Sequence, residues 1–155
     1  MRCSPSRIVS TAAMCGTALL FAAGDACAFV LITAQEAALP NAVAAEQLDR
    51  RGVTRAPKIL VLSPAPDAGV VRSPLNLLLK FETYGGAAID PFSVKVTYLK
   101  APAINLTQRI GNLVTSSGIE VHAAEVPAGT HHIRVEIKDN AGRVGSVVFP
   151  LMVAN

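Results

Sequence analysis

The stretch "VPAGTHHIRVEIKDNAGRVGSVVF", residues 126–149, decides the fold that we expect for this chain. Apolar and polar residues alternate along its first half, which places Ile133, Val135 and Ile137 on one face of a strand. The residues "DNAG" supply a turn, and a second strand follows with its own apolar row: Val147, Phe149, Leu151 and Val153. We therefore predict an antiparallel hairpin whose apolar face closes a core.

Shorter segments from residue 58 onward have the same period of two. "KILVL", "LNLLLKFET", "SVKVTYLK" and "GIEVHA" each alternate or are apolar throughout, and Pro- and Gly-containing turns separate them. "INLTQRIGNLV" is the one piece with room for a helical turn. About seven short strands without a long amphipathic helix predict an all-β protein, a Greek-key sandwich of two sheets over residues 57–155. Pro150 lies outside the inward-facing set and cannot donate a ladder hydrogen bond, so we expect a sheet edge there.

Residues 1–28 have the parts of an export signal. Arg2 and Arg7 form a basic start, an uncharged apolar stretch follows, and Ala26-Cys27-Ala28 resembles a cleavage site. We predict cleavage before Phe29 and a periplasmic or secreted protein. An uncleaved anchor fits less well, because Asp25 interrupts the apolar run before it reaches the roughly 20 residues of a spanning helix. Lipid attachment at Cys27 fits less well because Gly and Asp precede it.

Cleavage would remove all three cysteines, Cys3, Cys15 and Cys27, so the remaining 127 residues would have neither disulfides nor a thiol nucleophile. A chain of that length can bury roughly two-thirds of its unfolded surface without such crosslinks. Its 12 basic and 10 acidic residues give a net charge of +2 with no long run of one sign. Nucleic-acid binding, which needs clustered positive charge, is therefore not expected.

Residues 29–56 contain two possible short helices. Thr33 and Glu36 match a capping box, with Pro40 ending that turn, and Asn41 could cap a second helix that stops at Gly52. Neither helix has a clear apolar stripe, and short Ala-rich helices are marginal by themselves. We therefore expect this segment to be a mobile or loosely docked leader and linker.

The strand motifs resemble those of exported bacterial immunoglobulin-like domains. "VPAGTHHIRVEIKDNAGRVGSVVFPLMV" is similar to their closing strands, and "LSPAPDAGVVRSPLNLLLKF" is similar to their first two strands. The same motifs resemble small periplasmic copper-resistance proteins of the CopC type. That resemblance implies a His near the mature N-terminus and a His after the penultimate strand. This sequence has Phe29 and the turn Asp139–Arg143 at those positions.

Three histidines remain as candidate metal ligands: His122, His131 and His132. We expect His122 and His132 to lie on opposite sheets with outward side chains, which would prevent convergence on one ion. His131 precedes inward Ile133 by two residues, where immunoglobulin-like domains often carry a corner Tyr, so we predict a structural role. Asp139 and Asn140 fit a turn better than a calcium site, because calcium takes about six to eight oxygen ligands. The sequence therefore predicts no metal site and no cofactor.

No motif for catalysis is present. The chain has no nucleophile elbow, no phosphate-binding glycine loop and no HExxH pair. We expect a non-catalytic, exported immunoglobulin-like module that binds a protein or a cell-envelope component, by an edge strand near Pro150 or a groove beside the leader. The alternative is a periplasmic copper carrier of CopC-like type. A carbohydrate-binding domain is a third interpretation, although few aromatic residues are available for it.

Overall fold

A computed structural model of the chain describes residues 29–42 and 55–154. The predicted export signal and most of the second predicted leader helix lie outside these residues. In the first part are β1 (Phe29–Val30) and α1 (Ala34–Ala37). The second part contains β2 (Lys58–Ser63), β3 (Val70–Arg72), β4 (Leu75–Glu82), the 3-10 helix η2 (Pro91–Ser93), β5 (Lys95–Tyr98), β6 (Ile104–Asn105), α2 (Thr107–Ile110), the 3-10 helix η3 (Gly111–Leu113), β7 (Gly118–Glu125), β8 (Gly129–Lys138) and β9 (Val144–Ala154).

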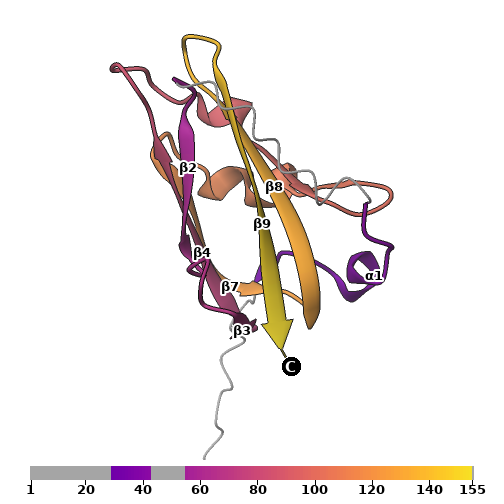
Figure 1. Cartoon of the computed structure of the whole chain (residues 1–155). Coiled ribbons are helices and arrows are strands. Elements are labelled where there is room, and N and C mark those ends of the chain that lie inside the picture. The colour runs from indigo at the N-terminus through magenta and orange to yellow at the C-terminus, as the bar shows by residue number, and fades with distance from the viewer. Residues whose placement is uncertain (1–28, 43–54, 155) are drawn as a thin grey trace, which may run out of the picture.

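These strands form two sheets that pack face to face (Figure 1). The four-stranded sheet has the order β1-β7-β4-β2, and the five-stranded sheet has the order β3-β9-β8-β5-β6. Pairing is antiparallel except between β1 and β7 and between β3 and β9. The chain passes between the sheets after β2, β3, β4, β6 and β7, so most neighbouring strands of a sheet are not consecutive in the sequence. The predicted all-β sandwich is confirmed.

The β8–β9 hairpin has the predicted register. Ile133 pairs with Phe149 and Val135 pairs with Val147, so the two apolar rows lie on the same face. Ile133 and Val135 are fully buried, and Ile137 is only 1% exposed. The intervening Arg134 and Glu136 keep part of their surface in solvent. The hairpin therefore closes the core as its alternation predicted, because side chains two residues apart share one face of a strand.

The other apolar rows also point inward. The predicted inner faces of β4, β5 and β7 are all buried: Leu75, Leu77, Leu79, Phe81, Val96, Tyr98, Ile119 and Val121, together with Val94 just before β5. The predicted helical turn is α2, which η3 continues. Its Ile110 and the preceding Leu106 reach the same core.

Pro150 lies at a sheet edge, as predicted. His132, its partner on β8, accepts a hydrogen bond from Leu99 N at 2.9 Å, so the backbone of His132 faces β5. The pair is thus a non-hydrogen-bonded one, and the backbone of Pro150 faces away from β8. On that outer side β3 pairs only with Met152, Val153 and Ala154. The missing N–H of Pro150 therefore leaves the ladder intact.

Residues 29–42 are packed against the sandwich, so the expectation of a mobile or loosely docked leader is wrong for them. Phe29 and Val30 extend the four-stranded sheet beside β7. Leu31 and Ile32, which follow, are 1% and 2% exposed and belong to the core. Two adjacent apolar residues before a helix leave no helical stripe, which is why the periodicity of the sequence did not indicate their burial.

The predicted capping box at the start of α1 is confirmed. Thr33 Oγ1 accepts a hydrogen bond from Glu36 N at 3.3 Å, and Thr33 N donates to Glu36 Oε2 at 2.9 Å. The helix ends at Ala37, before Pro40. Asn41 forms a β-bridge with Lys100, and a helix that begins there is not seen in the part of the chain that the structure describes.

Charged side chains hold this segment in place. Arg109 donates to both carboxylate oxygens of Glu36, at 2.9 and 2.6 Å, and to the carbonyl of Leu31 at 2.8 Å. The hydrogen bonds from Arg109 lower the pKa of Glu36 to about 2. The ammonium of Lys100 donates to the carbonyls of Ala37, the last residue of α1, and of Leu39, at 3.0 and 2.8 Å. These contacts satisfy carbonyl groups that a short helix leaves free.

Among residues 29–42 and 55–154, no helix is long and apolar enough to cross a membrane.

Candidate functional site

His131 is a buried structural residue. Its Nε2 lies 2.8 Å from the carbonyl oxygen of Pro127 and must carry the proton of that hydrogen bond. Its Nδ1 is therefore the acceptor for the hydroxyl of Tyr98, 2.7 Å away. Burial is the main cause that lowers the pKa of His131, and burial also raises the pKa of Tyr98 to about 12. Both nitrogens are occupied within the fold, so His131 has no free position for a metal.

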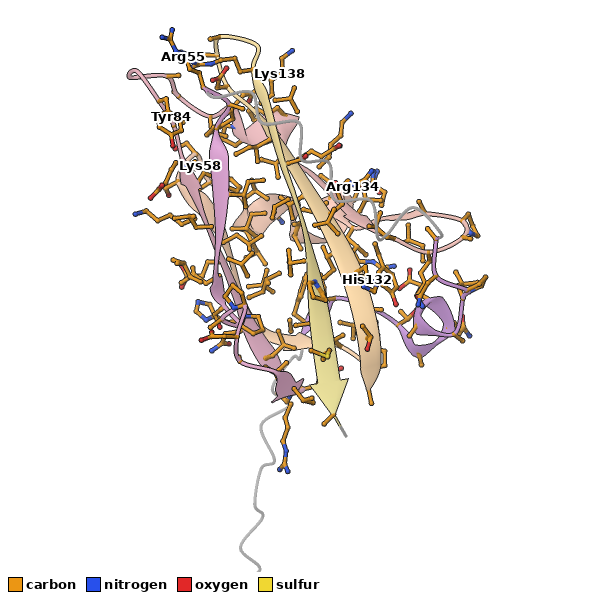
Figure 2. All side chains as sticks on the ribbon, in the orientation of Figure 1. Arg55, Lys58, Tyr84, His132, Arg134 and Lys138 are labelled. Atoms are coloured by element: carbon orange, nitrogen blue, oxygen red, sulfur yellow. The ribbon has the colours of Figure 1, made fainter. Side chains whose placement is uncertain are left out.

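His122 and His132 lie apart, on opposite sheets as predicted. His122 is on β7, and its exposed ring has Nε2 3.0 Å from Glu120 Oε1. His132 lies on β8 (Figure 2). Its Nδ1 is buried and has no hydrogen-bond partner in the described part of the chain. Within the same residues, no group of three His, Cys, Asp or Glu side chains is arranged to hold a metal ion.

The turn between β8 and β9 is built around Asp139. Its Oδ1 accepts from the backbone N–H groups of Ala141 and Arg143, at 3.0 and 2.8 Å, and its Oδ2 accepts from Nε of Arg143 at 2.7 Å. Burial raises the pKa of Asp139, but the hydrogen bonds from Arg143 outweigh it, so the net shift is downward. Gly142 has φ +79, the left-handed conformation that glycine tolerates. The carboxylate is thus used by the turn, as predicted, and not held open for calcium.

This turn is bonded to the connection between β4 and β5 at the same end of the sandwich. Asn140 donates from its backbone to Ala88 O at 2.9 Å, and its Oδ1 accepts from Ala88 N at 3.3 Å. Asp90 N donates to the carbonyl of Lys138 at 3.1 Å, and Ile89 forms a bridge with Asp139. Two connections that are far apart in the sequence therefore form one hydrogen-bonded end.

The side chain of Phe92 is exposed at the end of the sandwich that carries the β8–β9 turn. Its exposed fraction is 98%, although it belongs to η2, whose backbone is held firmly. Asp90 Oδ1 accepts from Phe92 N at 3.0 Å, and Pro91 occupies the first position of the turn. The hydroxyl of Ser93 lies 3.1 Å from the carbonyl oxygen of Lys138 and accepts from Lys138 N at 3.0 Å. A rigid turn thus holds a large apolar side chain in solvent.

The surroundings of Phe92 are partly apolar and partly basic. Val144, the first residue of β9, is 56% exposed, and Tyr84 is 40% exposed. Arg55 and Lys138 lie at the same end, and Tyr84 and Lys58 follow along its side (Figure 2). The ammonium of Lys58 lies 5.4 Å from the centre of the Tyr84 ring, within the range of a cation–π contact. The end of the sandwich that carries Phe92, the apolar tip, thus also carries the basic groups of Arg55 and Lys138.

Sequence reasoning did not identify this tip. The residues "DPFS" do indicate an N-capped turn, because Asp accepts the first free N–H and Pro suits the first helical position. The exposure of Phe92 carries no such signal, since an aromatic residue after a turn is as compatible with the core as with the surface. Only the bonds to the β8–β9 hairpin determine which way the turn faces.

Two grooves mark the sides of the sandwich. One, of about 400 Å³, has among its lining residues three leucines and two charged residues: Leu62, Leu78, Leu113, Lys80 and Glu120. A smaller one, of about 70 Å³, lies between the β2–β3 connection and Pro150. The expected contact edge near Pro150 is thus short, because β3 covers the residues that follow.

No family model matches the chain, and neither a curated protein nor a solved structure is similar enough to match it. The functional argument therefore depends on the geometry of the described residues.

Proposed function

We propose that the protein is an exported, non-catalytic immunoglobulin-like module that binds a partner protein through the end of the sandwich that carries Phe92. The observation that supports this function is the 98% exposure of Phe92 on a turn held by hydrogen bonds. Burying an exposed phenylalanine side chain contributes about 1.5–3 kcal/mol. Because the turn is already ordered, little of that free energy is spent on ordering it when a partner binds.

The backbone of the turn is suited to burial in an interface. The N–H groups of Asp90, Phe92, Ser93 and Val94 are all hydrogen-bonded within the chain, and Pro91 has none. A partner that covers the turn would therefore leave no backbone donor unpaired, which removes a common cost of complex formation. Aromatic residues are also enriched at the buried centres of protein interfaces.

Charge indicates the chemistry of the partner. Asp139 and Arg143 neutralise each other, whereas neither Arg55 nor Lys138, at the same end of the sandwich, forms a salt bridge with another residue of the described part of the chain. A complementary surface would have an apolar pocket for Phe92 and acidic groups around it. Such a rim adds mainly to the rate of association and to specificity, while the pocket supplies most of the affinity.

The described residues offer no support for the copper-carrier alternative. Both ring nitrogens of His131 are hydrogen-bonded, one to Tyr98 and the other to Pro127, and His122 and His132 lie on opposite sheets. A cell-envelope component other than protein is a possible outcome of the experiment below.

The test is site-specific photo-crosslinking followed by a measurement of affinity. A photoreactive phenylalanine analogue at position 92 of the full chain should crosslink to one protein in a cell-envelope extract, and that protein is then purified. We expect Phe92→Ala to weaken its binding by about 10- to 100-fold, the equivalent of burying one phenylalanine. Val70→Ala, which truncates an exposed side chain on β3 at the other end, is the matched control and should leave the affinity unchanged.

Two results would count against the proposal. Equal affinity of Phe92→Ala and the unmodified chain would remove Phe92 from the interface. Crosslinks only to lipid or glycan would identify a different class of partner at this end.

A further inference from the structure

Among the edge strands that the structure describes, β2 is the longest. The other edge strands, β1, β3 and β6, contain two, three and two residues, whereas β2 contains six. In the described part of the chain, β2 pairs with β4 on one side and with no strand on the other. Long free edges recruit further strands unless the sequence protects them.

The hydrogen bonds of β4 show which groups of β2 face outward. Phe81 N donates to Ser117 O at 2.8 Å, so the backbone of Phe81 faces β7. Ile59, its partner on β2, therefore belongs to a non-hydrogen-bonded pair, and its own N–H and C=O face away from β4. Val61, two residues later, has the same orientation. Neither residue has a backbone partner on that outer side within residues 55–154.

We infer that a second copy of the chain binds this edge, with β2 antiparallel to β2 and Leu60 on the two-fold axis. In this register Ile59 of each copy lies opposite Val61 of the other, so the outward N–H and C=O groups of both residues pair with each other. The two four-stranded sheets then form one continuous sheet. The interface is isologous, since the same residues contribute from both sides.

The side chains on the outer face fit this register. Leu60 meets Leu60 of the second copy at a non-hydrogen-bonded position, where side chains approach most closely. Leu62, which is 48% exposed, and the partly buried Leu78 extend the apolar strip on both sides of the axis. Lys58 lies opposite Leu62, and its ammonium is turned toward the Tyr84 ring. No two like charges are therefore brought opposite each other.

A proline interrupts the uncovered outer edge of β9, whereas no proline interrupts the edge of β2. On β9 the outward backbone position at residue 150 is a proline without an N–H, and β3 covers the residues beyond it. On β2 the residues from Lys58 to Val61 contain neither proline nor an inward-pointing charge, and the register shift after Val61 ends the regular pairing. The contact is short, so we expect a weak dimer with a dissociation constant in about the micromolar range.

The test is a charge exchange on the two-fold axis, measured by sedimentation equilibrium of the full chain. The unmodified chain should dimerise as its concentration rises. Leu60→Lys and Leu60→Glu should each be monomeric, because each places like charges opposite each other, and an equimolar mixture of the two should dimerise again. His122→Lys and His122→Glu change the charge on the same outer face two strands away and should leave the dimer intact.

A crosslinking experiment tests the register itself, in a chain whose Cys3, Cys15 and Cys27 are replaced by serine. Leu60→Cys should form a disulfide-linked dimer under mild oxidation, because directly opposed residues have Cα atoms roughly 4.5 Å apart, within disulfide range. Leu62→Cys should not, since its two copies would lie about 14 Å apart along the strands.

Three results would overturn the inference. One is an unmodified chain that stays monomeric at every concentration, another is a Leu60→Lys variant that dimerises as well as the unmodified chain, and the third is preferential crosslinking of Leu62→Cys. A monomeric chain that loses a different protein partner on Leu60→Lys would show that another occupant takes this edge.

Discussion

Replacing Val135 by aspartate should unfold the protein at neutral pH. Val135 is fully buried and lies between Val96 on β5 and Val147 on β9. The substitution loses about 1.5 kcal/mol or more of apolar burial. Keeping the new carboxyl group neutral at pH 7, about three units above its ordinary pKa of 3.9, costs about 4 kcal/mol more. The unpaired neutral group adds about 1–3 kcal/mol.

The total, about 6.5–8.5 kcal/mol, is comparable with the whole stability of a small domain, about 5–15 kcal/mol. Val135→Asn is the matched variant, because it has nearly the same shape and polarity without the charge. The free energies of unfolding of the two variants should differ by about 4 kcal/mol at pH 7. Arg134→Ala and Glu136→Ala, on the outward face, should each change stability by only about 0.5 kcal/mol.

The pH dependence separates charge from packing. Burial raises the folded-state pKa of the new aspartate above its unfolded value, so its penalty grows as the pH rises above about 4, is complete above the folded pKa, and disappears as the pH falls back toward about 4. Urea melts at pH 7 and pH 4 should therefore show the aspartate variant approaching the asparagine variant in acid. If Arg134→Ala unfolds the chain while Val135→Asp leaves it intact, the register of β8 is wrong by one residue and its inward assignments reverse.

Three other substitutions test the polar anchors and the close approach of the sheets. Glu36→Gln removes the ion pair that lowers the pKa of Glu36 to about 2, and after allowance for solvent screening it should cost about 1–2 kcal/mol above pH 4.5. Because the folded pKa is depressed, that stability is lost as the pH falls from 4.5 toward 2, so urea melts of the variant and the unmodified chain should converge there. Tyr98→Phe leaves the buried Nδ1 of His131 without its donor and should lower the free energy of unfolding by about 1–3 kcal/mol, whereas an unchanged melt would show that the bond contributes nothing. Gly145→Ala places a methyl group against the backbone carbonyl of Pro57, just before β2, and should lower the free energy of unfolding by about 1–3 kcal/mol. Gly111→Ala is the control, because Gly111 has helical dihedral angles and open space around it, so the melting temperature of this variant should be unchanged or raised. Thermal melts of the two variants check both expectations.

The sequence by itself predicted the sandwich because strand alternation is a local property. Ile133, Val135 and Ile137 are inward for the same reason that Arg134 and Glu136 are not, and the pattern needs no knowledge of what covers it. Turn chemistry is equally local, so the roles of Asp139 and Gly142 and the capping box at Thr33 were all predicted.

Only the tertiary structure decided how the first segment docks and where the exposed tip points. Leu31 and Ile32 enter the core because Arg109, far along the chain, bonds to Glu36 and to the backbone beside them. Phe92 faces solvent because Ser93 and Asp90 are bonded to β8 rather than to their neighbours alone. These placements depend on partners some 45 to 80 residues distant in sequence. The periodicity of the sequence cannot predict such contacts, because it indicates only which face of a helix or strand a residue occupies.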